Sequence, residues 1–129
     1  MKSYFIDTNY FLRLFIKDNR SQHLIVYRLF QKAIENEVKL TTSIIVFFEL
    51  YWVLKSFYKK DKKKCVFFLE KILQMSFLEI ESPEILLAAI TLYKNFNLDL
   101  EDCYNIVYYK IKNIDEFASF DKKVLKLIK

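Results

Sequence analysis

Four acidic side chains, far apart in the sequence, have the type and setting to bind a divalent cation. In chain order they are Asp7, Glu49, Asp102 and Asp121. Carboxylate oxygens are ligands that Mg²⁺ and Mn²⁺ favour. Carboxylates that converge repel one another, so such a cluster is stable only with bound protons or cations. A divalent cation held there could activate a water and stabilise the charge that develops on a phosphodiester.

Each of these acids also has a simpler structural explanation. Asp7 and Asp121 can cap the helices that follow them, and Asp102 can interact with the dipole at a helix N-terminus. Glu49 lies within the apolar stretch 44–54, which predicts a buried helix. A buried carboxylate needs a partner, so the alternative to a metal ligand is an ion pair with Arg13 or a lysine. The four acids are informative as a set rather than one by one.

The elements that must position these acids alternate between strand and helix. β-Prone segments predict strands at 3–6, 38–42, 77–81 and 116–120. Apolar spacing and capping residues predict helices at 10–16, 21–36, 44–57, 61–75, 83–95, 100–112 and 122–128. Strands separated by helices indicate an α/β fold with a parallel sheet flanked by helices on both faces. Asp7 and Asp121 then follow strands, at the sheet edge where ligands bind in such folds.

Length and composition exclude several other kinds of site. The chain has 129 residues, which predicts a single domain over 1–129. It contains no glycine, so a P-loop, a GxGxxG turn or a GxSxG nucleophile elbow cannot form in its usual shape. The sequence has one histidine, His23, which excludes a metal site built on two histidines of one chain. Nothing near His23 suggests the nucleophile of a Ser-His-Asp triad.

Charge and cysteine usage bear on partners and location. The net charge of +5 suits a polyanionic partner, although the lysine-rich run 59–64 is most simply a solvated loop and helix start. Cys65 and Cys103 form no ligand pattern, and we expect them to pack inside a reduced, cytoplasmic protein. The longest apolar stretch is 44–54, which is shorter than the roughly 20 residues that a membrane span needs.

The motifs around the four acids resemble those of PIN-domain ribonucleases, in order and over essentially the whole chain. Asp7-Thr8-Asn9 resembles the family's opening motif, and Phe48-Glu49-Leu50 resembles its second motif. The third motif is similar to Leu100-Glu101-Asp102 followed by Cys103-Tyr104-Asn105-Ile106, and the fourth is similar to Ser119-Phe120-Asp121. The resemblance implies a PIN-like α/β fold with a parallel sheet of about four or five strands.

The same resemblance implies an activity and its partners. The chain would be an endoribonuclease dependent on Mg²⁺ or Mn²⁺, and the toxin of a bacterial or archaeal type II toxin–antitoxin pair. Asp7, Glu49, Asp102 and Asp121 would hold one or two ions, with Asp99 and Glu101 as fallback ligands near Asp102. A cognate antitoxin would cover the site and an apolar groove, and two toxins would pair as a homodimer.

Two other functions fit the same residues. One is a non-enzymatic binding module of the same fold, in which the acids only cap helices and balance lysines. The other is a metal-dependent DNA nuclease or phosphatase. Metal binding separates the first from a nuclease, and cleavage of RNA, DNA and a small phosphate ester in parallel separates the second.

Overall fold

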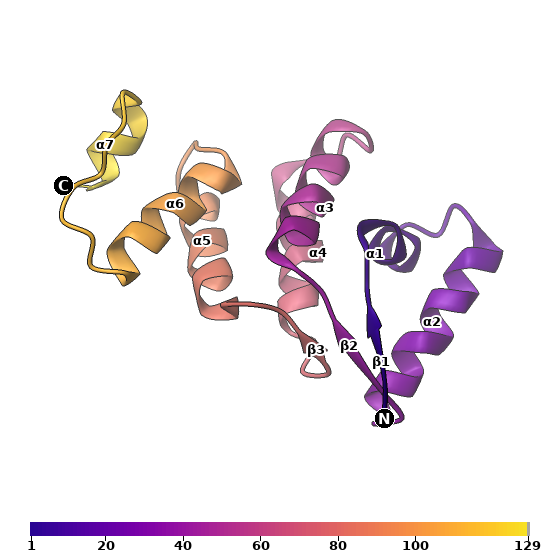
Figure 1. Ribbon diagram of the computed structural model, residues 1–129. Helices are drawn as coiled ribbons and strands as arrows, with labels where there is room; N and C mark the ends of the chain where they lie inside the picture. Colours follow the sequence, from indigo (N-terminus) through magenta and orange to yellow (C-terminus); the bar gives the residue numbers. More distant parts are fainter. Residues whose placement is uncertain (129) are drawn as a thin grey trace. The chain divides into compact units, whose positions relative to one another are not determined.

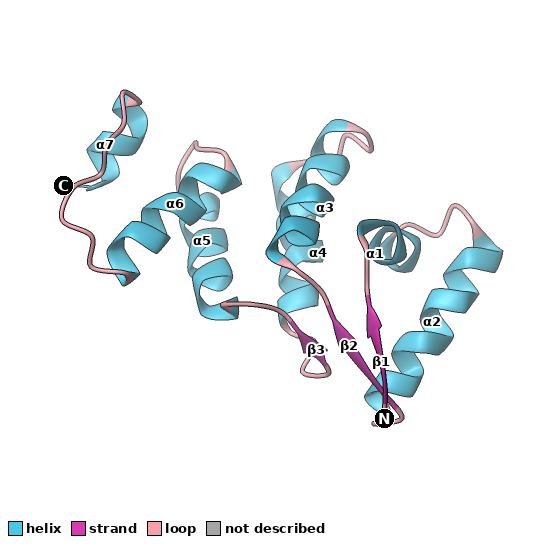
Figure 2. Cartoon of the chain, viewed as in Figure 1, coloured by secondary structure: helices cyan, strands magenta, loops and turns pink. Residues whose placement is uncertain are grey.

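The computed structural model describes residues 1–128, which contain three strands and seven helices (Figures 1 and 2). In chain order they are β1 (Lys2–Phe5), α1 (Thr8–Phe15), α2 (Arg20–Ile34), β2 (Val38–Thr41), α3 (Ile44–Ser56), α4 (Lys62–Leu73), β3 (Leu78–Glu79), α5 (Pro83–Asn95), α6 (Leu100–Ile111) and α7 (Lys122–Ile128). The chain divides into two compact units, an N-terminal unit up to Glu81 and a C-terminal unit from Ser82.

The N-terminal unit holds a parallel sheet in the order β1-β2-β3. β2 is the central strand, and its Leu40 pairs with Tyr4 of β1 and with Leu78 of β3. Leu40 is fully buried because helices connect each strand to the next. The predicted α/β class with a parallel sheet is therefore confirmed.

Aromatic side chains tie the helices of the N-terminal unit together. α1 contacts α2 and α3, α3 contacts α4, and α2 contacts β2. Phe11 of α1 packs edge-on against Phe30 of α2, with ring centroids 6.0 Å apart. Phe15 stacks on Phe68 of α4 at 4.7 Å. Such ring pairs add to the stabilisation that burial of apolar area provides.

Side-chain caps begin the first four helices. In each case the cap accepts a hydrogen bond from the backbone N–H three residues further on, and the capping residues are Asp7, Asn19, Ser43 and Asp61. Each cap satisfies one of the N–H groups that a helix start leaves without an internal partner. These caps explain why the predicted helix starts lie within two residues of the observed ones in this unit.

A chain without glycine must place other residues where the backbone turns left-handed. Among residues 1–128, the four with positive φ are Asn36, Lys59, Ser82 and Asn113, with φ between 46° and 61°. Asparagine tolerates this conformation best after glycine, and it occupies the two positions that follow α2 and α6.

The C-terminal unit is helical in its described part. α5 packs along α6, and α6 contacts α7. Leu86 and Ile90 of α5 and Leu100 and Ile106 of α6 are almost fully buried. Pro83 occupies the start of α5, where its missing N–H costs no helical hydrogen bond, as the sequence predicts.

The predicted number of strands is wrong for the described chain. Residues 1–128 contain three strands rather than four or five, and the strand predicted at 116–120 is irregular. Phe117 packs instead against Tyr109 of α6, the Tyr109 hydroxyl donates to the carbonyl of Asp115, and Phe120 is fully exposed. Local contacts with α6 hold this segment, and a β-prone composition forms a strand only where another strand pairs with it.

The strand predicted at 77–81 is also shorter than expected, since β3 spans only Leu78–Glu79. No helix within residues 1–128 combines the length and apolar character needed to cross a membrane.

Candidate functional site

Asp7 lies directly after β1, where the sheet meets α1. Its Oδ1 accepts a hydrogen bond from the backbone N–H of Tyr10 at 3.2 Å, so the predicted capping role is confirmed. The side chain is nevertheless exposed. Within residues 1–128, its second oxygen, Oδ2, accepts no hydrogen bond. One carboxylate oxygen is thus fixed by the helix while the other is available to a cation.

The ends of β1 and β2 are joined by hydrogen bonds just before the residues of interest. Ile6 donates its N–H to the carbonyl of Thr41 at 2.8 Å, and the Thr42 hydroxyl donates to the carbonyl of Ile6 at 2.7 Å. Thr42 is buried, and its own N–H donates to Glu79 of β3. These bonds fix Asp7, which follows β1, relative to α3, which follows β2.

Glu49 of α3 accepts a hydrogen bond from the hydroxyl of Thr8, the residue after Asp7. Thr8 is 6% exposed, so its hydroxyl is held in one place by the packing of α1. The hydrogen bond joins Oε1 of Glu49 to the segment that carries Asp7. The structure therefore places Asp7 and Glu49 at the same edge of the sheet.

The expectation that Glu49 lies in a fully buried helix is wrong. Glu49 is exposed, and Ile45 and Trp52 on the same side of α3 are 77% and 56% exposed. The opposite side of α3 is buried. In the described chain Glu49 forms no ion pair with Arg13 or with a lysine, because Arg13 pairs with Asp18.

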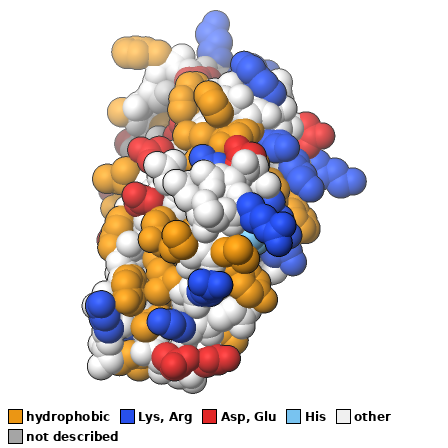
Figure 3. All heavy atoms as spheres, turned by 90° about the vertical axis from the view of Figure 1, so that its right-hand side faces the viewer, with side chains coloured by type: hydrophobic (Ala, Val, Ile, Leu, Met, Phe, Trp, Pro, Cys, Tyr) orange, Lys and Arg blue, Asp and Glu red, His pale blue; other side chains and the backbone are white. Residues whose placement is uncertain are grey.

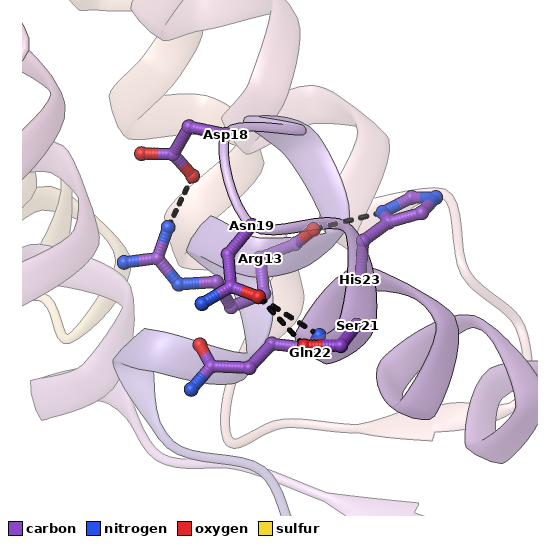
Figure 4. Close-up of polar contacts among 6 residues, drawn as sticks. All are labelled: Arg13, Asp18, Asn19, Ser21, Gln22 and His23. Atoms are coloured by element: carbon purple, nitrogen blue, oxygen red, sulfur yellow. Dashed lines mark hydrogen bonds and ion pairs between the residues drawn. The ribbon is translucent and has the colours of Figure 1, made fainter.

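A hollow of about 540 Å³ opens beside Asp7, between α1 and α2. Its lining residues are Asp7, Asn9, Tyr10, Arg13, Gln22, Ile25 and Val26. Figure 4 shows how the α1–α2 connection holds Arg13, which pairs with Asp18, while Asn19 caps α2. His23 Nδ1 donates to the carbonyl of Arg13 at 2.9 Å, a structural role for the lone histidine.

Asp102 and Asp121 both belong to the C-terminal unit. Asp102 lies in the first turn of α6 and is half-buried. Burial raises the pKa of Asp102, and the negative charges of Asp121 and Asp99 raise it further. The fallback ligand Asp99 is therefore close enough to act on Asp102, while Glu101 is exposed on the same turn.

Asp121 caps α7, and the expectation that it follows a strand is wrong, because residues 116–120 form no strand. Its Oδ1 accepts hydrogen bonds from the backbone N–H groups of Lys123 at 2.9 Å and Val124 at 3.3 Å. Within the described residues, Oδ2 accepts none. Asp121 thus has the same arrangement as Asp7, with one oxygen fixed by a helix start and one oxygen left over.

Each unit contributes two of the four predicted carboxylates. Within either unit, the described residues contain no group of three His, Cys, Asp or Glu side chains that could hold a metal ion. The donor chemistry itself fits a hard divalent cation, because every candidate ligand is a carboxylate and several have one oxygen fixed and one available. Cys65 and Cys103 contribute nothing here, because both are buried and burial raises the pKa of the Cys65 thiol.

Thr8 is a candidate positioning residue that the sequence did not single out. In the motif Asp7-Thr8-Asn9 only Asp7 was considered as a candidate ligand. The hydrogen bond from Thr8 to Glu49 spans 41 positions of the sequence, so the motif alone does not reveal it. The available signal was a threonine placed beside a candidate ligand at the start of a helix.

Comparison with known families identifies the class of this protein. The family model of the PIN domain matches residues 4–129. The match covers nearly the whole chain, so the protein belongs to the PIN-domain family. PIN domains are generally nucleases and typically use divalent metal ions. No curated protein and no solved structure matches the chain at a significant level.

Proposed function

We propose that this protein is an endoribonuclease that uses Mg²⁺ or Mn²⁺ and acts as the toxin of a toxin–antitoxin pair in the cytoplasm. The observation that carries the proposal is shared by three of the acids. One oxygen accepts a hydrogen bond from the protein, and the other accepts none within residues 1–128; these acids are Asp7, Glu49 and Asp121. Carboxylates fixed in this way are prepared ligands for a cation.

Asp102 adds the electrostatic part of the argument. Its carboxylate is held near Asp121 and Asp99 although the three charges repel one another. A bound divalent cation would replace that repulsion with attraction. We propose Asp7, Glu49, Asp102 and Asp121 as the ligands, which also act in catalysis.

The chain's own residues prepare the site in distinct ways. Thr8 orients Glu49 through its hydroxyl, and the Tyr10 N–H fixes Asp7. Arg13, beside Asp7 in the hollow, provides a positive charge for a phosphate of the RNA. When bound, the divalent ion supplies Lewis-acid stabilisation of the reacting phosphate and lowers the pKa of water.

The direct test is cleavage of RNA by the purified protein with Mg²⁺, with Mn²⁺ and with EDTA. We expect cleavage with either ion and none with EDTA, and loss of cleavage in Asp7→Asn. Duplex DNA and a small phosphate ester are tested in parallel. Cleavage of DNA alone, or of the ester alone, would contradict the RNA assignment, and stable folding without any hydrolysis would favour a binding module.

The proposed antitoxin needs an apolar surface near the site. Leu24, Ile25 and Tyr27 of α2 are exposed, and Ile25 lines the hollow beside Asp7. On the face drawn in Figure 3, apolar side chains alternate with lysine and arginine side chains, and acidic side chains are fewer. We propose that an antitoxin covers this surface of α2. The proposed homodimer is tested by the mass of the free protein in solution.

A further inference from the structure

A second hollow, of about 530 Å³, lies where α3 ends and α4 begins. Its lining residues are Lys59, Lys60, Asp61, Lys63, Lys64 and Phe67, which we call the lysine patch. From the sequence alone, this run is most simply a solvated loop and helix start. The structure instead gathers four lysines and one aromatic ring around a single concave surface.

The aromatic ring of the lysine patch lies beside two lysine side chains and remains half-exposed. Phe67 is 47% exposed, and the Nζ atoms of Lys64 and Lys71 each lie 5.2 Å from its ring centroid. Lysines around an exposed ring combine the two features that bind single strands, which are charge for phosphates and a flat surface for a base. A duplex has no unstacked base to offer to such a ring.

The lysines lie at a helix N-terminus, where the helix dipole disfavours positive charge. The first turn of α4 contains no acid and carries Lys62, Lys63 and Lys64, although a helix N-terminus favours negative charge. Asp61 accepts a hydrogen bond from the Lys64 N–H at 2.8 Å and caps the helix, so this carboxylate serves the backbone. Positive charge concentrated at a positive helix end is suited to a polyanion.

The lysine patch belongs to the same unit as Asp7 and Glu49. α3 leads directly from Glu49 to the patch, and the eight residues from Glu49 to Phe57 correspond to about 12 Å of helix. Tyr58, in the loop after α3, lies near Arg13, which lines the hollow beside Asp7. Basic and aromatic side chains therefore line both hollows of this unit.

We propose that the lysine patch is a binding site for single-stranded RNA, with phosphates on Lys63 and Lys64 and a base stacked on Phe67. The strand continues past Tyr58 and Arg13 to the hollow beside Asp7. The inference rests on the proposed function for its choice of nucleic acid. It adds a site, separate from the four proposed ligands, that holds the substrate.

The test measures binding of a short fluorescent oligouridylate to the full chain in EDTA, where no cleavage occurs. We expect the Lys63→Gln/Lys64→Gln variant to bind roughly tenfold more weakly, with a salt dependence whose log–log slope is smaller by about 1.4, since each single-strand phosphate contact contributes about 0.7. The matched control is Lys32→Gln/Lys110→Gln, which removes two exposed lysines from the last turns of α2 and α6. It should bind like the wild type.

A second variant tests stacking separately from charge. Phe67→Leu keeps an apolar side chain, and we expect about fivefold weaker binding of the oligouridylate with unchanged binding of an abasic oligomer of equal length. The control is Tyr108→Leu, because Tyr108 is a half-exposed ring with a lysine, Lys112, 5.6 Å from its centroid. It should not weaken binding.

The outcomes separate this inference from the proposed function. Equal binding by the patch variants and their controls would refute the lysine patch even if the protein cleaves RNA. Displacement of the RNA by polyglutamate at equal charge concentration would also refute it and would point to an acidic protein as the partner. Loss of binding in the patch variants alone would support the site, whether or not cleavage is observed.

Discussion

The hydroxyl of Thr8 donates a hydrogen bond to the carboxylate of Glu49, across 41 positions of the sequence. Thr8 is buried at the start of α1 and Glu49 is exposed on α3, so a fixed donor orients a carboxylate that solvent can reach. An exposed glutamate on a helix would otherwise sample several rotamers. The contact converts Glu49 from a mobile surface acid into a positioned one.

Replacing Thr8 by valine should lower RNA cleavage by about 10- to 100-fold, because outer hydrogen bonds to metal ligands typically have effects of this size. Thr8→Ser keeps the hydroxyl and should retain most activity. The measurement is the cleavage rate as a function of Mg²⁺ concentration. Thr8→Val should require more Mg²⁺ for half-maximal rate, and an unchanged requirement would show that Thr8 does not act through Glu49.

Thr42 should be as important for stability as Thr8 is for activity. Its buried hydroxyl donates to the carbonyl of Ile6 and joins the ends of β1 and β2. Thr42→Val leaves that carbonyl without its partner, and we expect a loss of about 1–3 kcal/mol of unfolding free energy. Thr42→Ser should lose less. Urea denaturation measures both, and wild-type stability in Thr42→Val would contradict the assigned role.

Much of the fold could be predicted because its signals are local. Ser43 and Pro83 mark helix starts through capping and backbone geometry, and the structure confirms both. The strand predicted at 116–120 is wrong because strand formation also depends on a pairing partner elsewhere in the chain. Its β-prone residues carry no information about a pairing strand, and in the structure Phe117 packs on α6 instead.

The surroundings of the candidate site residues could not be predicted from the sequence. The apolar neighbours of Glu49 predicted burial, yet Ile45 and Trp52 are exposed with it on one side of α3. A sequence shows how apolar a helix is, but the neighbouring helices decide which sides they cover. The contact between Thr8 and Glu49 depends on the pairing of β1 with β2, which local sequence does not predict.

Binding of Mn²⁺ by the proposed carboxylate ligands should stabilise the folded chain. At a Mn²⁺ concentration ten times the Kd, stabilisation is about 1.4 kcal/mol, or roughly 5 °C in Tm. Asp7→Asn and Asp102→Asn should each weaken this shift, because each removes a proposed ligand. Thermal unfolding with Mn²⁺ and with EDTA provides the measurement. A shift that survives in both variants would contradict the proposed ligands.

The stability of the metal-free protein should depend on pH through Asp102. Its pKa is raised above the ordinary value of 3.8 by burial and by Asp121 and Asp99, so the folded state binds the proton more tightly than the unfolded state does. The unfolding free energy therefore falls as pH rises from 3.8 through the raised pKa, and this loss persists at higher pH.

Asp102→Asn removes the ionisable group, so in EDTA it should be more stable than the wild type near neutral pH, with the advantage disappearing below pH 3.8. Glu101→Gln, on the same helical turn but exposed, serves as the matched control for the removal of a negative charge. Chemical denaturation across this pH range measures the difference, and a lower stability of Asp102→Asn at neutral pH in EDTA would show that repulsion does not govern this carboxylate.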